Sequence, residues 1–211
     1  MNTYFNEIKI IEDSRVHVGI AKHFESVSWC GKATAPASDV REALHYLCVR
    51  DGFVYGTDGR RLHIYRQPEN NVPVNMVLTD GLWNIKTKSK KQLVLEKSGK
   101  PLDEYPNVWG VFSPQPEFLG NFREDVRFCK DEMDIFDEFV FILSRVCDRV
   151  YPLTHLRDAF LSCTVFSVEM HGQQQMLVIG NDERIACVMP FVQKEIAFES
   201  YDAIQYLMEV E

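Results

Sequence analysis

The segment FVYGTDGRRLHIYR, from Phe53 to Arg66, places a polar, turn-forming cluster between two short apolar runs. The runs 53–55 and 62–65 have the β-branched and aromatic content of strands, and a Thr-Asp-Gly connection between strands is typical of a tight turn. Glycine takes the positive φ that such a turn requires. The segment therefore predicts a β-hairpin. Its two arginines fit either a solvated turn or a binding site.

The composition is that of a globular protein with a sizeable core. The chain has 211 residues, of which 45% are hydrophobic and 26% are charged, which is enough for one large or two small domains. No apolar run approaches the roughly 20 residues of a membrane helix, and the N-terminus has no basic start followed by an apolar stretch. We therefore expect a cytoplasmic protein that makes no membrane contact.

The cysteine and histidine patterns argue against a metal site. The six cysteines include no C-x-x-C pair and lie mostly in apolar runs, as buried free thiols do. The histidines show no H-E-x-x-H motif and no paired Cys/His spacing, and the chain has no acidic calcium loop. We expect no metal and no cofactor.

The charge balance limits the kind of nucleic-acid contact that the chain can make. A net charge of −8 argues against coating nucleic acid by bulk attraction, but it leaves room for a local basic surface. Lysines cluster between positions 86 and 100, and Arg15 and Lys22 lie along an expected helix near the start. Each cluster also fits an ordinary solvated face.

Local patterns in the first half predict a helix followed by hairpins. Apolar residues recur at helical spacing from Val16 to Trp29. A capped helical turn then leads into a strand and a D-G turn within 38–52, and alternation predicts a second hairpin over 81–97. Four prolines between 101 and 116 fit neither a helix nor a central strand. They predict a boundary that divides the chain into domains 1–115 and 116–211.

The second half predicts two helices and a meander. The segment from Met133 to Val150 is amphipathic, with one apolar stripe and one charged face, and we expect it to pack on a sheet. A short helix over 154–162 precedes three strands with turns near 171 and 181. The string GTDGRRL is weakly echoed by GNDERIA, which suggests an internal repeat. The predicted class is α+β, with two similar domains of antiparallel sheets and packed helices.

These motifs resemble a known family. The string VYGTDGRRLHIYR is similar to the middle domain of bacterial DNA sliding clamps, the beta subunit of DNA polymerase III, where a T-D-G-x-R-L turn follows two strands. The matching residues are Thr57, Asp58, Gly59, Arg61 and Leu62. The string EYPNVWGVFSP resembles the segment that closes that domain, and the strands ending in Val-Met-Pro at 188–190 resemble the end of the last domain.

The chain also departs from the family pattern. It is shorter than the family's three domains, so we expect the first to be missing. Residues 120–149 replace the usual pattern, and the tail 192–211 continues where clamps normally stop.

The resemblance implies a peptide-binding pocket. In the family, the turn and the terminal M-P segment lie side by side and capture short apolar peptides of polymerases and clamp loaders. The implied site residues are Thr57, Gly59, Arg60, Arg61, Leu62, Val188, Met189 and Pro190. The apolar walls would be formed by Leu62, Val188, Met189 and Pro190. The polar rim would be formed by Thr57, Arg60 and Arg61.

Two alternatives to an open pocket remain. Leu62 and Val188 also fit ordinary core positions. The tail would also make an internal plug for the pocket, through Phe198, Tyr201, Tyr206 and Leu207.

The resemblance also implies partners. A ring of six such domains would need three copies of a two-domain chain, joined head to tail as a homo-oligomer. Double-stranded DNA would be contacted weakly and without sequence preference by the helix-borne residues Arg15, Lys22 and Arg145. The alternative is a clamp-fold adaptor or decoy that binds replication proteins without encircling DNA.

An enzyme is the rival class. His45 lies near Cys48 in the sequence, and His155 lies near Asp158 and Cys163, which would supply a base and a nucleophile. Neither set occupies a recognisable nucleophile turn or has an evident oxyanion donor. We therefore expect no catalytic residue, with a small Cys/His hydrolase as the less favoured alternative.

Overall fold

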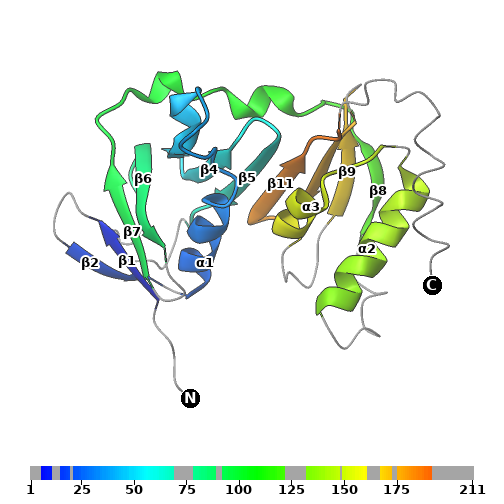
Figure 1. The fold of residues 1–211 in the computed structure, drawn as a ribbon, viewed down its shortest axis with the longest axis horizontal. Coiled ribbons are helices and arrows are strands. Elements are labelled where there is room, and N and C mark those ends of the chain that lie inside the picture. Colours follow the sequence, from blue (N-terminus) through cyan, green and yellow to red (C-terminus); the bar gives the residue numbers. More distant parts are fainter. Residues whose placement is uncertain are drawn as a thin grey trace, which may run out of the picture.

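The strands join in one large, mostly antiparallel sheet. The computed structural model describes residues 6–10, 15–19, 21–68, 78–88, 92–121, 132–147, 149–160, 167–172 and 175–191. The sheet of these residues has 11 strands in the order β2-β1-β7-β6-β3-β4-β5-β11-β10-β9-β8 (Figure 1). The strands are β1 Asn6–Ile10, β2 Arg15–Gly19, β3 Leu47–Arg50, β4 Phe53–Thr57, β5 Arg61–Arg66, β6 Gly81–Lys88, β7 Gln92–Lys97, β8 Glu117–Asn121, β9 Ser167–His171, β10 Met176–Gly180 and β11 Arg184–Val188.

Three α-helices accompany the described part of the sheet. They are α1 Ala21–Cys30, α2 Glu132–Val146 and α3 Leu153–Ala159. The helix α1 packs on β4 and β5, whereas α3 packs on β11. Single 3-10 turns form at η1 Glu42–His45, η3 Leu102–Glu104 and η4 Val108–Val111. The α+β class with antiparallel strands and packed helices is confirmed.

The centre of the sheet has an approximate two-fold relationship. The strand β5 ends the meander β3-β4-β5, β11 ends the meander β9-β10-β11, and the two strands pair antiparallel. In this ladder Leu62 faces Cys187, and Ile64 faces Ile185. The β5–β11 ladder therefore joins the two meanders into one sheet.

The two hairpins that lead into this ladder use the same turn. Asp58 Oδ1 accepts hydrogen bonds from the backbone N–H groups two and three residues later, at 2.8 and 3.0 Å. Asn181 Oδ1 does the same at 3.0 and 2.9 Å. The echo between GTDGRRL and GNDERIA thus corresponds to a repeated turn. However, the structure matches Asp58 with Asn181, one position away from the direct alignment of the strings.

Buried side chains fill both faces of the sheet. One cluster contains Val27 and Trp29 of α1, Phe139 of α2 and Val188 of β11. A second cluster contains Tyr55, Leu62, Ile64, Cys187 and residues of the proline-rich segment, among them Tyr105 and Val108. Alternate residues of a strand point to opposite faces. Neighbouring positions in β11 therefore belong to different clusters.

Most local predictions are confirmed, with two corrections. The hairpins, the helical turn before β3, the short helix α3 and the final meander are present. The predicted helix from Val16 is wrong in its first part, because Arg15–Gly19 is a strand paired with β1 and the helix begins at Ala21. Valines 16 and 18 alternate with period two, which suits a strand.

The second correction concerns the end of α2, which lies at Val146 and not at Val150. Pro152 follows soon afterwards, and the residue before a proline disfavours helical geometry. The predicted boundary between residues 115 and 116 falls between η4 and β8. The sheet runs continuously from one half to the other, and the division into two domains stays a prediction.

A close approach between α1 and β4 makes a first test of this packing. A Cβ atom added to Gly56 would meet the backbone carbonyl of Cys30. We expect Gly56→Ala to lower the free energy of unfolding by roughly 1–3 kcal/mol, because backbone must move to admit the methyl group. Gly99→Ala is the control, since nothing lies within 4 Å of that position. Urea unfolding with equal midpoints for the two variants would contradict the packing described.

Candidate functional site

The turn between β4 and β5 is held by its own side chains. Thr57 Oγ1 donates to the Arg61 carbonyl at 2.6 Å and accepts from the Gly59 N–H at 3.0 Å. Gly59 has a φ of +83°, which is costly for residues with a Cβ atom. The threonine hydroxyl is therefore occupied within the turn, so it stabilises the turn and does not form a free rim.

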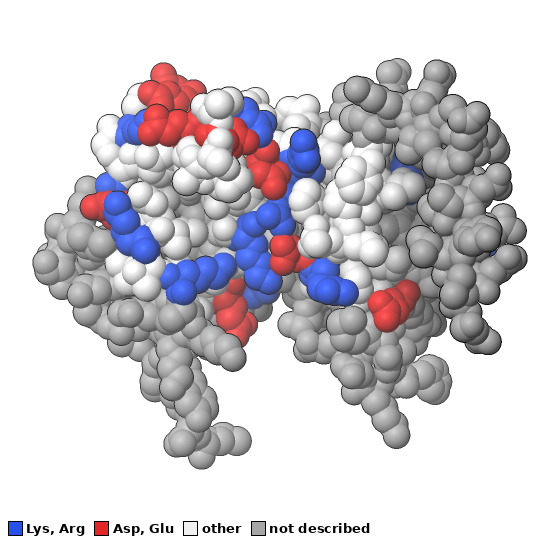
Figure 2. Space-filling view, in the orientation of Figure 1, with Lys and Arg blue, Asp and Glu red and all other residues white. Residues whose placement is uncertain are grey.

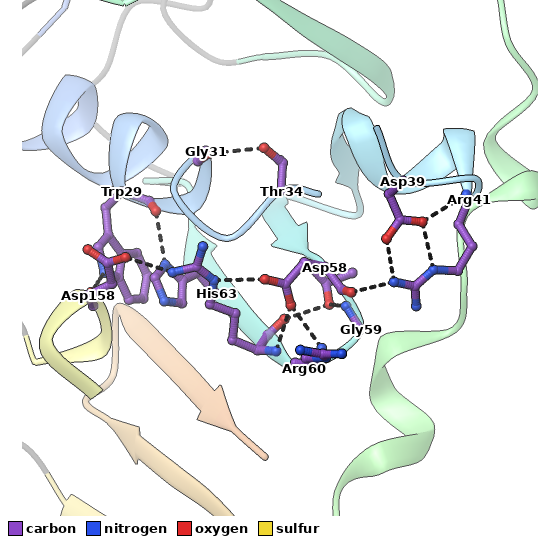
Figure 3. Close-up of polar contacts among 12 residues, drawn as sticks. Trp29, Gly31, Thr34, Asp39, Arg41, Asp58, Gly59, Arg60, His63 and Asp158 are labelled. Atoms are coloured by element: carbon purple, nitrogen blue, oxygen red, sulfur yellow. Dashed lines mark hydrogen bonds and ion pairs between the residues drawn. The ribbon is translucent and has the colours of Figure 1, made fainter. Parts of the chain in front are cut away.

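A residue from the segment before η1 braces the turn from outside (Figure 3). Arg41 Nη2 donates to the Asp58 carbonyl at 2.8 Å. Asp39 fixes this arginine by accepting from its Nε at 3.0 Å and its Nη2 at 2.7 Å. These hydrogen bonds hold the pKa of Asp39 well below its usual value. Sequence reasoning missed this brace, because no local pattern links positions 39–41 to the turn.

Arg61 points inward instead of forming the predicted polar rim. Its Nε donates to Asp58 Oδ2 at 3.0 Å and its Nη1 to Asp158 Oδ2 at 2.6 Å, and only 15% of its side chain is exposed. Lys32 Nζ lies 3.3 Å from Asp158 Oδ1. The guanidinium group thus connects the turn to α3, because a largely buried charge requires paired partners.

Trp29 and His63 pack beside this ion pair at the meeting point of α1, α3 and β5. The two rings stack at 4.1 Å with an interplanar angle of 12°. His63 Nδ1 donates to the Trp29 carbonyl at 2.9 Å, and Trp29 Nε1 donates to the Asp158 carbonyl at 2.6 Å. Burial lowers the pKa of His63 from 6.5 to about 4. The imidazole is therefore neutral at physiological pH.

The structure brings the turn and the Val-Met-Pro segment side by side. Val188 is the register partner of Arg61, and the Met189 N–H donates to the Arg60 carbonyl at 2.8 Å. Arg60 and Gly59 are exposed, whereas Met189 and Pro190 are partly buried. These four residues form the accessible part of the predicted site.

The predicted apolar walls need one correction. Val188 is fully buried in the cluster beneath the helices, whereas Leu62 is buried on the other face of the sheet. A common pocket wall made of both is therefore wrong, because the sheet separates them. Cys187 is the residue that faces Leu62, and it lies in the same cluster. Sequence reasoning missed it, although alternation along β11 would have indicated it.

The proline-rich segment carries an aromatic group on the same face of the sheet as Leu62. The ring of Trp109 lies edge-on to Phe53 and Tyr55, at 5.4 and 6.0 Å between ring centroids. Phe112 lies 5.7 Å from Trp109 and 5.7 Å from the ring of His171. Ser113 N–H donates to His171 Nδ1 at 3.0 Å. The segment is thus anchored to both halves of the sheet.

The histidines and the described cysteine of the alternative hydrolase have other roles in the structure. His45 Nε2 hydrogen-bonds to the Asp39 carbonyl at 2.8 Å, and burial raises the pKa of the Cys48 thiol to about 12. Such a thiol is not an activated nucleophile at neutral pH. Desolvation lowers the pKa of His155, and its proposed partner Cys163 lies outside the described residues.

Among the residues that the structure describes, no group of three or more His, Cys, Asp and Glu side chains could hold a metal ion. No helix in the described ranges is long and apolar enough to cross a membrane.

The predicted DNA-contacting residues are spread over separate elements. Arg15 lies in β2 and is not helix-borne, Lys22 lies in α1, and the side chains of both are outside the described part. Arg145 is exposed in α2 with its guanidinium 4.8 Å from the Phe141 ring centroid.

Additional basic residues lie near the end of α1. Figure 2 shows lysine and arginine side chains gathered over the middle of the face that carries the helices. Lys88 Nζ donates to the Ser28 carbonyl at 2.8 Å. Burial, and then the nearby charge of Lys32, lower the pKa of Lys88. Sequence reasoning did not place Lys32 and Lys88 together.

Comparison with known proteins gives structural likenesses only. No family model matches the chain, and no curated protein matches it. The fold is similar to the DNA polymerase III beta subunit of Thermotoga maritima, at 10% identity over 85% of this chain and 65% of that chain, with a TM-score of 0.48. It is also similar to the sliding clamp of Bacillus subtilis, at 12% identity over 91% of this chain and 65% of that one, with a TM-score of 0.49. The sliding clamp of Pseudomonas aeruginosa with ligand gives 14% identity over 82% and 65%, with a TM-score of 0.48. The chain thus spans 65% of the length of each of these clamps.

The buried imidazole predicts a pH-dependent stability. Because the pKa of His63 is about 4 in the folded chain and 6.5 ordinarily, the unfolded chain binds an extra proton between these pH values. The contribution of the neutral His63 to the free energy of unfolding should be complete above pH 6.5. This contribution should fall by up to about 3 kcal/mol as the pH drops toward 4. His63→Phe keeps an aromatic ring against Trp29 and removes this titration, so its profile should be flatter. Urea unfolding from pH 4 to 7.5 measures both profiles, and parallel curves would contradict the assignment.

Proposed function

We propose that this chain is a non-catalytic docking protein of the sliding-clamp type, which captures short apolar peptide segments of replication proteins beside the β4–β5 turn. One observation carries the proposal. The T-D-G-x-R-L turn and the V-M-P segment, which are far apart in the sequence, are joined by the β5–β11 ladder and by the bond from Met189 to Arg60. Their adjacency is what the sequence resemblance requires of a peptide site.

The accessible groups suit a short peptide with a few apolar anchors. Met189 and Pro190 offer partly buried apolar surface, and Leu62 and Cys187 lie in the cluster against which Met189 packs. A methionine side chain adapts to varied partners, and such grooves concentrate affinity in a few contacts. The exposed Arg60 lies at the edge, where a charge guides encounter more than it adds affinity.

A methionine substitution tests the docking site. Met189→Asp should weaken binding of a labelled peptide with leucine and phenylalanine anchors by at least about 2 kcal/mol, or about 30-fold in Kd. Arg60→Ala should have a smaller effect. Phe141→Asp is the matched control, because this phenylalanine is 58% exposed and lies on α2, which carries no residue of the proposed site. Fluorescence polarisation measures the three affinities.

Two outcomes would count against the docking proposal. One is the absence of any binding by the wild-type chain. The other is equal affinity for Met189→Asp and Phe141→Asp. Leu62→Asp is less informative, because Leu62 is buried and a charge there destabilises the fold itself.

The proposal extends to assembly and DNA contact. Within the described residues, the sheet ends in β2 on one side and β8 on the other, and exposed strand edges favour pairing with another chain. Head-to-tail pairing of these edges would place the helix-bearing face, with Lys32, Lys88 and Arg145, toward enclosed DNA. The alternative is an adaptor that does not encircle DNA. The irregular register of β8 between Phe118 and Gly120 favours this alternative, because a bulge in an edge strand hinders its pairing with another chain.

Mass in solution separates these two forms. Light scattering should give three times the 24.5 kDa of one chain, as expected for a ring of three two-domain copies. Phe118→Lys places a charge at the exposed edge strand and should shift the mass toward one chain, whereas Val40→Lys should not. A strictly monomeric wild type at high concentration would leave only the adaptor. DNA binding by the ring should weaken steeply with salt and show no sequence preference.

A further inference from the structure

The proline-rich segment, residues 101–116, connects two well-separated strands on the face of the sheet that the helices leave open. It runs from β7 to β8, which lie third and last in the strand order (Figure 1). Tyr105 of this segment is buried in the cluster that contains Leu62. Phe112 and Met189 pack against the same cluster. The position of the segment therefore shapes the surface beside Met189.

His171 holds the far end of this segment through two hydrogen bonds. The Ser113 N–H donates to His171 Nδ1 at 3.0 Å, and His171 Nε2 lies 3.0 Å from Glu169 Oε2. A backbone N–H only donates and an ionised carboxylate only accepts, so Nδ1 carries the lone pair and Nε2 carries the hydrogen. The ring of Phe112 lies edge-on to the imidazole at 5.7 Å between centroids. This arrangement requires a neutral imidazole.

Protonation of the ring would remove one of these bonds and keep the other. In a protonated imidazole both nitrogens carry a hydrogen, so Nδ1 of His171 would face the Ser113 N–H as a second donor. Glu169 accepts from Nε2 in the neutral and in the protonated form. The contact that responds to the charge of the ring is therefore the one with the proline-rich segment.

The described elements packed against His171 bring one charged side chain to it. The strand β10 places Met176 opposite the residue, and the proline-rich segment contributes an aromatic ring and a backbone N–H. In β8, Glu117 is the register partner of the residue before His171, so its side chain points to the other face of the sheet. On its own strand the charged neighbour is Glu169.

We propose that His171 is a proton-controlled positioning residue. Its neutral form holds the proline-rich segment against the second half of the sheet, and its charged form releases Ser113. Histidine changes its charge between about pH 5 and about pH 8, so this latch responds near neutral pH. Its consequence for peptide capture rests on the proposed docking site: release of the segment moves Phe112 away from the cluster that it shares with Met189.

Hydrogen exchange of the wild-type chain at two pH values tests the latch. Protection factors remove the intrinsic pH dependence of exchange, so values at about pH 8 and about pH 5.5 are comparable. The protection of amides 109–113 should fall at least about fivefold on acidification, as expected for the loss of one hydrogen bond, whereas that of β4 should change little. Unchanged protection of 109–113, or an equal loss in β4, would overturn the proposal.

Two substitutions separate the latch from a merely structural role of the histidine. His171→Asn keeps an acceptor near the position of Nδ1 but does not titrate, so the segment should stay protected at both pH values. His171→Leu removes the acceptor, so protection should be low at both. An asparagine variant with the pH response of the wild type would assign the titration to another group and contradict the proposal. If His171→Leu fails to fold by circular dichroism, the wild type and His171→Asn still decide the question.

Peptide affinity tests the consequence for docking. The labelled peptide with leucine and phenylalanine anchors should bind the wild type at least about threefold more weakly at the lower pH, and should bind His171→Asn equally at both. Equal affinity of the wild type at both pH values, with a segment that loosens, would remove the positioning role. If the wild type binds no peptide, the docking proposal fails, and exchange of the segment still decides whether the latch exists.

Discussion

The rest of the structure depends on the β5–β11 ladder. Each strand ends a three-stranded meander, and their antiparallel pairing makes one sheet out of two similar units. The register sets which residues of the two halves meet. It places the Thr-Asp-Gly turn beside the Val-Met-Pro segment. It also brings α1 and α3, which pack on the paired strands, close enough for Trp29 to donate a hydrogen bond to the Asp158 carbonyl.

A polar connection above the ladder couples the two halves further. Asp158 of α3 accepts from Arg61 through its carboxylate and from Trp29 through its carbonyl. Removing one partner of Asp158 would leave a charge or an N–H group that is neither paired nor well solvated. The resulting loss in the free energy of folding is larger than the net contribution of the hydrogen bond itself. The same groups position the turn. The proposed docking site at the turn and the packing at the helix junction therefore share one arginine, Arg61.

Two surfaces of different character result from this arrangement. Beside the turn, Arg60 and Gly59 are accessible next to the partly buried Met189, a combination of polar edge and adaptable apolar surface. At the end of α2, by contrast, the exposed residues are large and apolar. Phe191, the last described residue, hydrogen-bonds to Val150 in this region. The first surface suits a transient partner. The second resembles an incomplete core.

The sequence by itself determined the elements whose signals are local. The hairpin around Asp58, the amphipathic α2 and the final meander follow from turn chemistry and periodicity, and the α+β class follows from their order. Only the tertiary structure decided that Arg15 lies in a strand, that Arg61 turns inward to Asp158, and that Val188 and Leu62 lie on opposite faces. The physical reason is that strand pairing and register join residues distant in the sequence, and a side chain's face is fixed by its partner strand as well as by its own neighbours.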